Sequence, residues 1–219
     1  MGTIIKRMRN ADLVTVIRTI MILASAYLII YKFNPFAIIL IIAVAMLLDS
    51  VDGYFAVREV SEKKVSFLTY SKSIMGNQKA REQISELKHK VSKAARFGPR
   101  IDIAGDRIAE YVMWIVFTYL NVIPLFVIFI IVIRHSLADA LLASKGTSSK
   151  MKSKLARSLY ASNSSRAGIQ ILKFVTFSYL VLVYISDYPV ILGYILTAAL
   201  VTFILVRGAA EIYESVYKE

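Results

Sequence analysis

Two pairs of aspartates stand at helical spacing within otherwise apolar sequence. Asp49 and Asp52 are three residues apart, and Asp102 and Asp106 are four residues apart. Residues at these spacings share one face of a helix, so each pair presents its carboxylates in the same direction. Carboxylate oxygens are the ligands that hard divalent cations such as Mg²⁺, Mn²⁺ and Ca²⁺ prefer. The spacing therefore predicts a metal site to which two neighbouring helices contribute.

Simpler explanations account for one such aspartate but not for four. A single aspartate near a helix end commonly caps the helix or pairs with an arginine such as Arg100 or Arg107. Four carboxylates at the edge of a membrane are different, since each costs about 2.5–3.5 kcal/mol at mid-membrane unless it is neutralised. The neighbouring Gly53, Gly98 and Gly105 also leave room for a ligand or another backbone. A bound cation would explain both the four carboxylates and the space that the glycines leave beside them.

The composition is that of a membrane protein with a basic surface. The chain is 57% hydrophobic and has 27 Lys and Arg against 15 Asp and Glu, a net charge of +12. This excess suits anionic lipid headgroups or phosphate-bearing substrates, but it is also what cytoplasmic loops of any membrane protein show. We expect no nucleic-acid partner. The absence of cysteine excludes disulfides and cysteine-ligated zinc or iron.

Six segments are long and apolar enough to cross a membrane, which takes about 20 residues. They are residues 12–32, 34–57, 100–121, 122–144, 166–186 and 188–212. The pattern predicts an all-α, polytopic membrane protein that forms a single domain over residues 1–219.

Three short connections that contain proline join the first segment to the second, the third to the fourth and the fifth to the sixth. They are Asn34-Pro35, Ile123-Pro124 and Asp187-Tyr188-Pro189. Only one basic residue, Lys32, lies near these connections, whereas the N-terminus and the two long loops hold most of the others. The positive-inside rule therefore predicts that both termini are cytoplasmic. Because Asp12 and Arg18 interrupt the first apolar stretch, we interpret the N-terminus as mature protein and not as a signal peptide.

Residues 59–97 form a long polar insertion between the second and third segments. Within it, Ile84, Leu87, Val91 and Ala95 recur at steps of three and four, which predicts a helix over residues 78–96. This basic helix is expected either to lie on the inner leaflet or to extend into solvent.

The aspartates and their neighbours resemble the signature of the CDP-alcohol phosphotransferase family, D-x-x-D-G-x-x-A-R, a spacer and G-x-x-x-D-x-x-x-D. The matching residues are Asp49, Asp52, Gly53, Ala56, Gly98, Asp102 and Asp106. There are two departures. Val57 stands where the family has arginine, with Arg58 one residue later, and the insertion makes the spacer far longer than usual.

The resemblance implies an enzyme of phospholipid biosynthesis in the cell membrane, with six spans and an active site that faces the cytoplasm. It would transfer a phosphatidyl or archaetidyl group from a CDP-linked lipid to an acceptor hydroxyl and release CMP. Two divalent ions, Mg²⁺ or Mn²⁺ with Ca²⁺ as a further option, would be bound by Asp49, Asp52, Asp102 and Asp106. Asp106 would also be the general base, and a homodimer is expected. Donor contacts are implied for Asp12, Thr15, Arg18, Gly53, Ala56, Arg58 and Gly98. Because Arg18 lies in an apolar run, it needs a carboxylate or a phosphate partner, so a structural ion pair is the alternative for this residue.

The acceptor is predicted from basic residues within the cytoplasmic end of the fourth segment and after it. Arg134, Lys154, Arg157 and Arg166 would suit a phosphorylated acceptor such as inositol phosphate or glycerol phosphate. The alternative is that the loop lysines and arginines only set topology. The adjacent His135 is expected to pack or cap, not to bind metal. A different class of function also fits the aspartates, namely a cation transporter or channel whose path they line.

Overall fold

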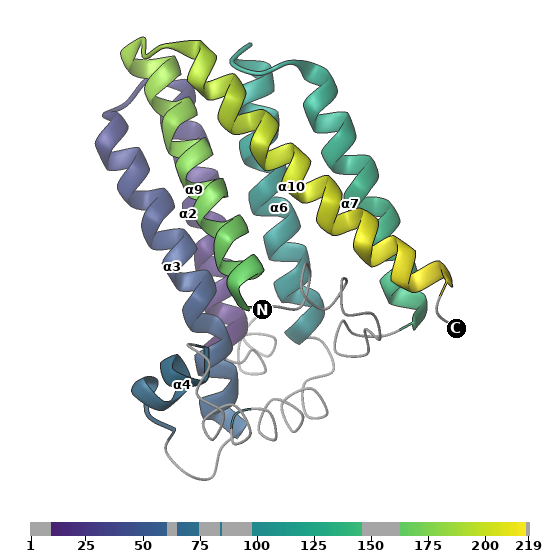
Figure 1. Ribbon diagram of the computed structural model, residues 1–219. Helices are drawn as coiled ribbons and strands as arrows, with labels where there is room; N and C mark the ends of the chain where they lie inside the picture. The colour runs from purple at the N-terminus through teal and green to yellow at the C-terminus, as the bar shows by residue number, and fades with distance from the viewer. Residues whose placement is uncertain (1–9, 61–64, 75–83, 85–97, 146–162, 218–219) are drawn as a thin grey trace, which may run out of the picture. The chain divides into compact units, whose positions relative to one another are not determined.

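The computed structural model describes residues 10–60, 65–74, 84, 98–145 and 163–217. Every element within them is an α-helix, as Figure 1 shows from purple α2 to yellow α10. The helices are α2 (Asn10–Ile30), α3 (Pro35–Val60), α4 (Phe67–Ile74), α6 (Gly98–Tyr119), α7 (Leu125–Lys145), α9 (Asn163–Ser186) and α10 (Val190–Tyr217). The all-α prediction is confirmed. The helix predicted over residues 78–96 lies outside the described residues except for Ile84.

The first helix ends where a backbone turn of left-handed conformation closes it. Lys32 has φ 50°. Its N–H donates to Ile29 O at 2.9 Å, and the N–H of Phe33 donates to Leu28 O at 3.0 Å. These two bonds satisfy carbonyls that the helix end would otherwise leave without donors. This is why α2 stops before the end of the segment predicted at 12–32.

The next helix is started by the Asn34-Pro35 pair. The Asn34 side-chain oxygen accepts from the N–H groups of Phe36 at 3.0 Å and Ala37 at 3.2 Å. Pro35 is the first helical residue, where its missing N–H costs nothing. The other two predicted turns are also found, and each has one residue with positive φ, Asn121 at 56° and Asp187 at 53°.

Three described helical segments are long and apolar enough to cross a membrane: Asp12–Ile30, Ser165–Ser186 and Val190–Ala210. A shorter apolar stretch, Pro35–Asp49, forms most of α3. Large apolar side chains along these helices are exposed, for example Ile20 at 58%, Leu40 at 64% and Ile171 at 64%. Long apolar helices with exposed apolar faces indicate a membrane protein.

The described residues form two compact units, one drawn from residues 1–27 and 40–110, the other from residues 28–39 and 111–219. In the first unit, α2 contacts α6 through Gly105 and contacts α3 through Arg18. Helix α4 packs against the end of α3, where Tyr54, Val57 and Tyr70 form a buried cluster with Ile84.

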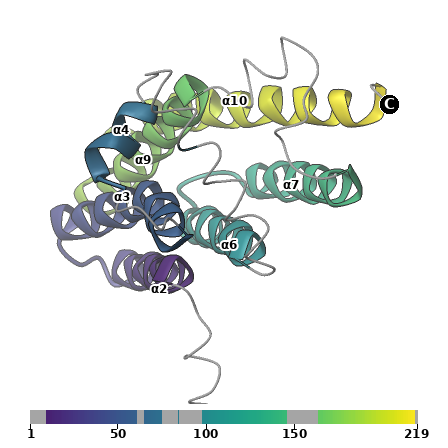
Figure 2. The same cartoon turned by 90° about the horizontal axis from the view of Figure 1, so that it is seen from below.

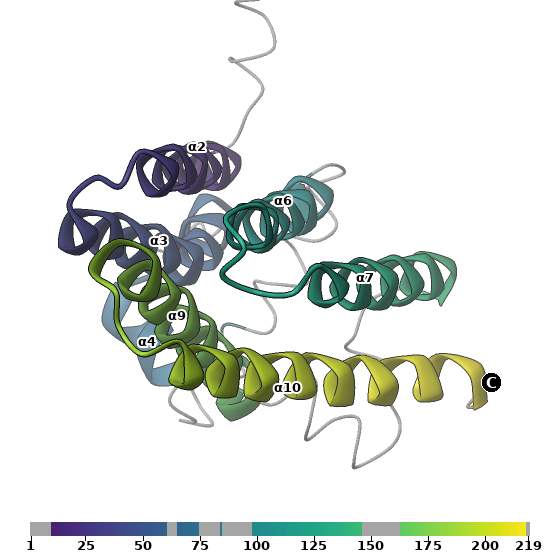
Figure 3. The same ribbon diagram turned by 90° about the horizontal axis from the view of Figure 1, so that it is seen from above.

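In the second unit, α10 packs against both α9 and α7. Figures 2 and 3, which view the protein from below and from above, both show α10 beside α7. The aromatic core of this unit lies between α6 and α9. The ring of Phe177 is 5.1 Å from that of Trp114, edge to face, and 6.1 Å from that of Phe117, stacked. Gly193 lets α10 approach α9, since a Cβ there would lie 3.2 Å from Leu180 Cδ2.

Candidate metal centre

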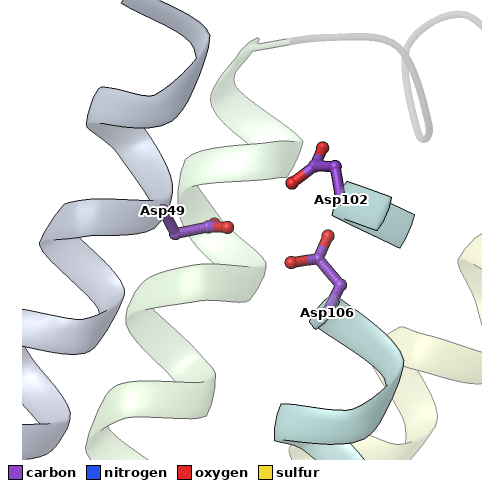
Figure 4. A group of neighbouring side chains, drawn as sticks. All are labelled: Asp49, Asp102 and Asp106. Carbon is purple, nitrogen blue, oxygen red and sulfur yellow. The ribbon is translucent and has the colours of Figure 1, made fainter. Parts of the chain in front are cut away.

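Three of the four predicted metal ligands converge within the first unit. Asp49 extends from α3 toward Asp102 and Asp106 of α6, as Figure 4 shows. One carboxylate oxygen from each of the three lies within 4.8 Å of the others. Oxygens on opposite sides of one cation are separated by twice the metal–oxygen bond, about 4.2 Å for Mg²⁺ and 4.8 Å for Ca²⁺. The three carboxylates are therefore close enough to hold one divalent cation.

The two helices bring these carboxylates together for reasons that the sequence contains. Helix α6 begins at Gly98-Pro99, and a proline in the first turn is tolerated because N–H groups there have no helical partner. Asp102 and Asp106 follow one turn apart on the same face. Their side chains are 49% and 43% exposed, whereas that of Asp49 is 18% exposed. The cluster thus has one sheltered carboxylate, that of Asp49, and two carboxylates that a molecule from solution could reach.

Arg18 of α2 contacts all three carboxylates. Its Nη1 pairs with Asp49 Oδ1, and its Nη2 lies 2.7 Å from Asp106 Oδ1 and 3.8 Å from Asp102 Oδ1. The Arg18 side chain is only 5% exposed. The sequence left a structural ion pair and a ligand contact as alternatives for this residue, and the ion pair is present.

The predicted donor-contact residues of α2 lie on the same helix face as Arg18. Asp12 is 7% exposed and Thr15 is 3% exposed. Thr15 contacts α6 at Gly105, where a Cβ would lie 2.5 Å from Thr15 Cγ2 and 3.4 Å from Arg18 Nη2. Gly105 therefore allows α2 to approach the stretch of α6 between the two aspartates, as expected of a glycine that leaves room for another helix.

The remaining predicted residues of this motif are only partly described. Asp52, Gly53 and Ala56 lie in α3 and Gly98 in α6, but their side-chain surroundings are outside the described part of the chain. Arg58, at the end of α3, is exposed. The structure therefore brings together three of the four predicted ligands and leaves the position of the Asp52 carboxylate as a prediction.

The departure at Val57 has a structural explanation. Val57 is 1% exposed and packs with Tyr54, Tyr70 and Ile84. The Tyr54 and Tyr70 rings meet edge to face at 5.7 Å, and the Tyr54 hydroxyl donates to Val65 O at 3.2 Å. An arginine at position 57 would place its charge among these apolar side chains, which is costly without a partner. The valine and the inserted segment are thus two parts of one packing arrangement.

The predicted acceptor residues belong to the second unit or lie outside the described chain. Arg134 of α7 is 9% exposed, and its side chain crosses Gly208 of α10, where a Cβ would be 2.4 Å from Arg134 Nε. Arg166 is exposed, and Lys154 and Arg157 lie outside the described residues. His135 packs with its ring 5.6 Å from that of Tyr111, which confirms the packing role expected for it.

The sequence analysis missed two buried charged residues. Arg207 of α10 is 8% exposed and donates from Nη1 to Ser165 O at 3.3 Å. Glu110 of α6 is 5% exposed. A signal was present for both: Glu110 continues the four-residue spacing of Asp102 and Asp106, and Arg207 interrupts an apolar segment just as Arg134 does.

Comparisons with known proteins found no similar protein. No family model matches the sequence, and no curated protein and no solved structure matches the chain.

Proposed function

We propose that this protein is a metal-dependent transferase of the membrane that moves a phosphoryl-linked lipid group from a CDP-alcohol to an acceptor hydroxyl and releases CMP. The observation that carries the proposal is the convergence of Asp49, Asp102 and Asp106, whose carboxylate oxygens lie within 4.8 Å of one another. They come from helices that also hold Asp52, Gly53, Ala56 and Gly98, the other residues that match the CDP-alcohol phosphotransferase signature. Six spans with cytoplasmic termini, and a homodimer, are part of this proposal.

The metal site would be formed by these three residues together with Asp52. Two divalent ions bound there would neutralise the donor diphosphate and the charge that develops as CMP leaves. Mg²⁺ and Mn²⁺ suit an all-carboxylate set best, and Ca²⁺ would also fit. The exposed sides of Asp102 and Asp106 leave this cluster open to a phosphate group.

Asp106 is the residue best suited to take the acceptor proton. Its carboxylate is 43% exposed, so an acceptor hydroxyl can reach it. As the acceptor oxygen bonds to the phosphorus that carries the lipid alcohol, its proton passes to Asp106. The bond from that phosphorus to the bridging oxygen breaks, and its electron pair leaves with CMP.

The acceptor is proposed to be phosphorylated, as inositol phosphate or glycerol phosphate would be. Arg134 and Arg207 are cations buried within the apolar helices of the second unit. Buried arginines in membrane helices commonly bind anions or line polar pathways. An acceptor without a phosphate, such as serine, would need fewer cations.

The test is CMP release by the full chain purified in detergent. CDP-diacylglycerol, CDP-archaeol and soluble CDP-alcohols are assayed with Mg²⁺ or Mn²⁺ against glycerol phosphate, inositol phosphate and serine. We expect CMP that depends on both metal and acceptor, and its loss in Asp106→Asn. The absence of CMP with every donor and metal would refute the proposal, and ion flux in vesicles under those conditions would favour the transporter interpretation.

A further inference from the structure

Arg18 neutralises part of the negative charge of the three aspartates, and it would compete with a cation for the same carboxylates. Its guanidinium lies among the three carboxylates that would bind the cation, paired with Oδ1 of Asp49 and Oδ1 of Asp106. Three ionised carboxylates and one guanidinium leave two formal negative charges, which one divalent cation would cancel. A cation that entered this cluster would nevertheless lie beside a positive guanidinium, and the two repel each other strongly where water is scarce.

Arg18 also has hydrogen-bonding capacity that the described residues do not use. Its buried Nε has no hydrogen-bond partner among them, and its contact with Asp106 is an ion pair without the geometry of a hydrogen bond. Guanidinium groups have five N–H donors and match phosphate oxygens in two-pronged contacts. A buried donor that lacks an acceptor beside a cation site is what an incoming phosphate would satisfy.

We propose that Arg18 exchanges partners: it neutralises the aspartates in the metal-free protein and contacts the phosphate of the ligand once a divalent cation takes its place. The inference rests on the metal site of the proposed function. Its consequence is thermodynamic. Because the phosphate provides the partner that Arg18 loses to the metal, phosphate and metal bind with positive coupling, and each raises the affinity for the other.

The test measures Mn²⁺ binding by EPR to the detergent-purified full chain, with and without saturating CMP. CMP is the probe because its single phosphate binds free Mn²⁺ weakly. In the unsubstituted protein CMP should raise Mn²⁺ affinity about 5-fold or more, the lower end of common coupling between sites. Arg18→Gln should bind Mn²⁺ more tightly without CMP and should lose the CMP effect. Lys72→Gln, an exposed cation on α4, should behave like the unsubstituted protein.

A second variant separates the exchange from general damage to the fold. Arg18→Lys keeps the positive charge but not the two-pronged contact, so Mn²⁺ affinity without CMP should stay near that of the unsubstituted protein while the CMP effect falls. Weaker or unchanged Mn²⁺ binding in Arg18→Gln, with normal elution and helix content, would overturn the exchange. So would a CMP effect that survives in both variants. If the unsubstituted protein bound no Mn²⁺, the proposed function would fall along with it.

Discussion

Thr15 of α2 lies directly against Gly105 of α6, so close that a Cβ on Gly105 would be 2.5 Å from Thr15 Cγ2. Gly105→Ala should therefore push α2 away from α6 and draw the Arg18 guanidinium away from Asp106. We expect a loss of stability of about 1–3 kcal/mol, typical of overpacking at a tight interface. Mn²⁺ binding should change as well, because the Arg18 guanidinium would no longer lie in its present position among the three carboxylates. Thermal unfolding in detergent and Mn²⁺ titration measure the two effects.

Two further variants show whether this contact is the cause. Thr15→Ser removes Cγ2, so the double variant Gly105→Ala/Thr15→Ser should regain most of the stability that Gly105→Ala loses. Gly168→Ala in α9 is the matched control, since a Cβ there meets nothing within 4 Å. If Gly168→Ala were as harmful as Gly105→Ala, the loss would not come from the approach of α2 to α6.

The three aspartates should differ in how they affect stability, although each contributes to metal binding. Asp49 is the most buried of them and pairs with Arg18 Nη1, so Asp49→Asn leaves that buried cation with less neutralisation. We expect a loss of about 1–3 kcal/mol, the cost of leaving a buried polar group without its partner. Asp102→Asn should cost much less, because its side chain is 49% exposed and 3.8 Å from Arg18 Nη2. Equal stability of the two variants, measured by thermal unfolding without metal, would contradict this order.

The aspartate spacing predicted that Asp49, Asp102 and Asp106 would lie close together, but it did not determine what would lie among them. Periodicity determines which face of a helix a residue occupies, so the pairing of Asp102 with Asp106 follows from the sequence alone. How closely α2 approaches α6 depends on three-dimensional packing at Gly105, and the contacts of Arg18 depend on that approach. The sequence therefore left two partners open for Arg18, carboxylate or phosphate.

The helices were predictable where apolar length dominates and were missed where packing decides. The long apolar segments and their proline turns are local features, and they were found near their predicted places. Helix α4 was not predicted, because its eight residues are too few for a clear periodic pattern. Its stability comes from contacts with Tyr54 and Val57, which are distant in sequence.

The cluster at the end of α3 should not tolerate the arginine found in the family signature. Val57→Arg would place a charge at a position that is 1% exposed, next to Tyr54 and Tyr70. We expect α4 to detach from α3, with faster proteolysis within residues 59–97 and a lower unfolding temperature. Leu68→Arg is the control, since Leu68 lies on α4 but is 69% exposed. If Val57→Arg resisted protease as well as Leu68→Arg does, the cluster would not be what holds α4.

Gly208 should affect acceptor use through Arg134. A Cβ on Gly208 would be 2.4 Å from Arg134 Nε and 2.9 Å from its Cγ, so Gly208→Ala must displace the arginine. In the CMP-release assay, Gly208→Ala and Arg134→Ala should both raise KM for a phosphorylated acceptor about tenfold, the effect of one lost charged hydrogen bond. The KM for the CDP-alcohol should stay the same. Unchanged acceptor kinetics in Arg134→Ala would refute its assignment to the acceptor.

The proposed orientation can be tested cleanly because the chain has no cysteine, so each introduced thiol is the only one. Phe33 is 55% exposed, Tyr119 is 72% exposed and Tyr188 is 47% exposed, and all three lie at the short turns that we place outside the cell. Phe33→Cys, Tyr119→Cys and Tyr188→Cys should therefore react with a membrane-impermeant maleimide in intact cells. Lys72→Cys and Tyr213→Cys should react only after the membrane is opened.

The middle turn is the decisive position, because it joins α6 and α7, and neither of them contains one of the three segments that are long and apolar enough to cross a membrane. Labelling of Tyr119→Cys from outside, together with protection of Lys72→Cys, requires that the chain cross the membrane between α4 and the end of α6. If α6 is the crossing helix, its start, with Asp102 and Asp106, lies on the cytoplasmic side. If Tyr119→Cys were instead labelled only in opened cells, α6 and α7 would not both cross, and the arrangement of six spans would be wrong even if the aspartates bind metal.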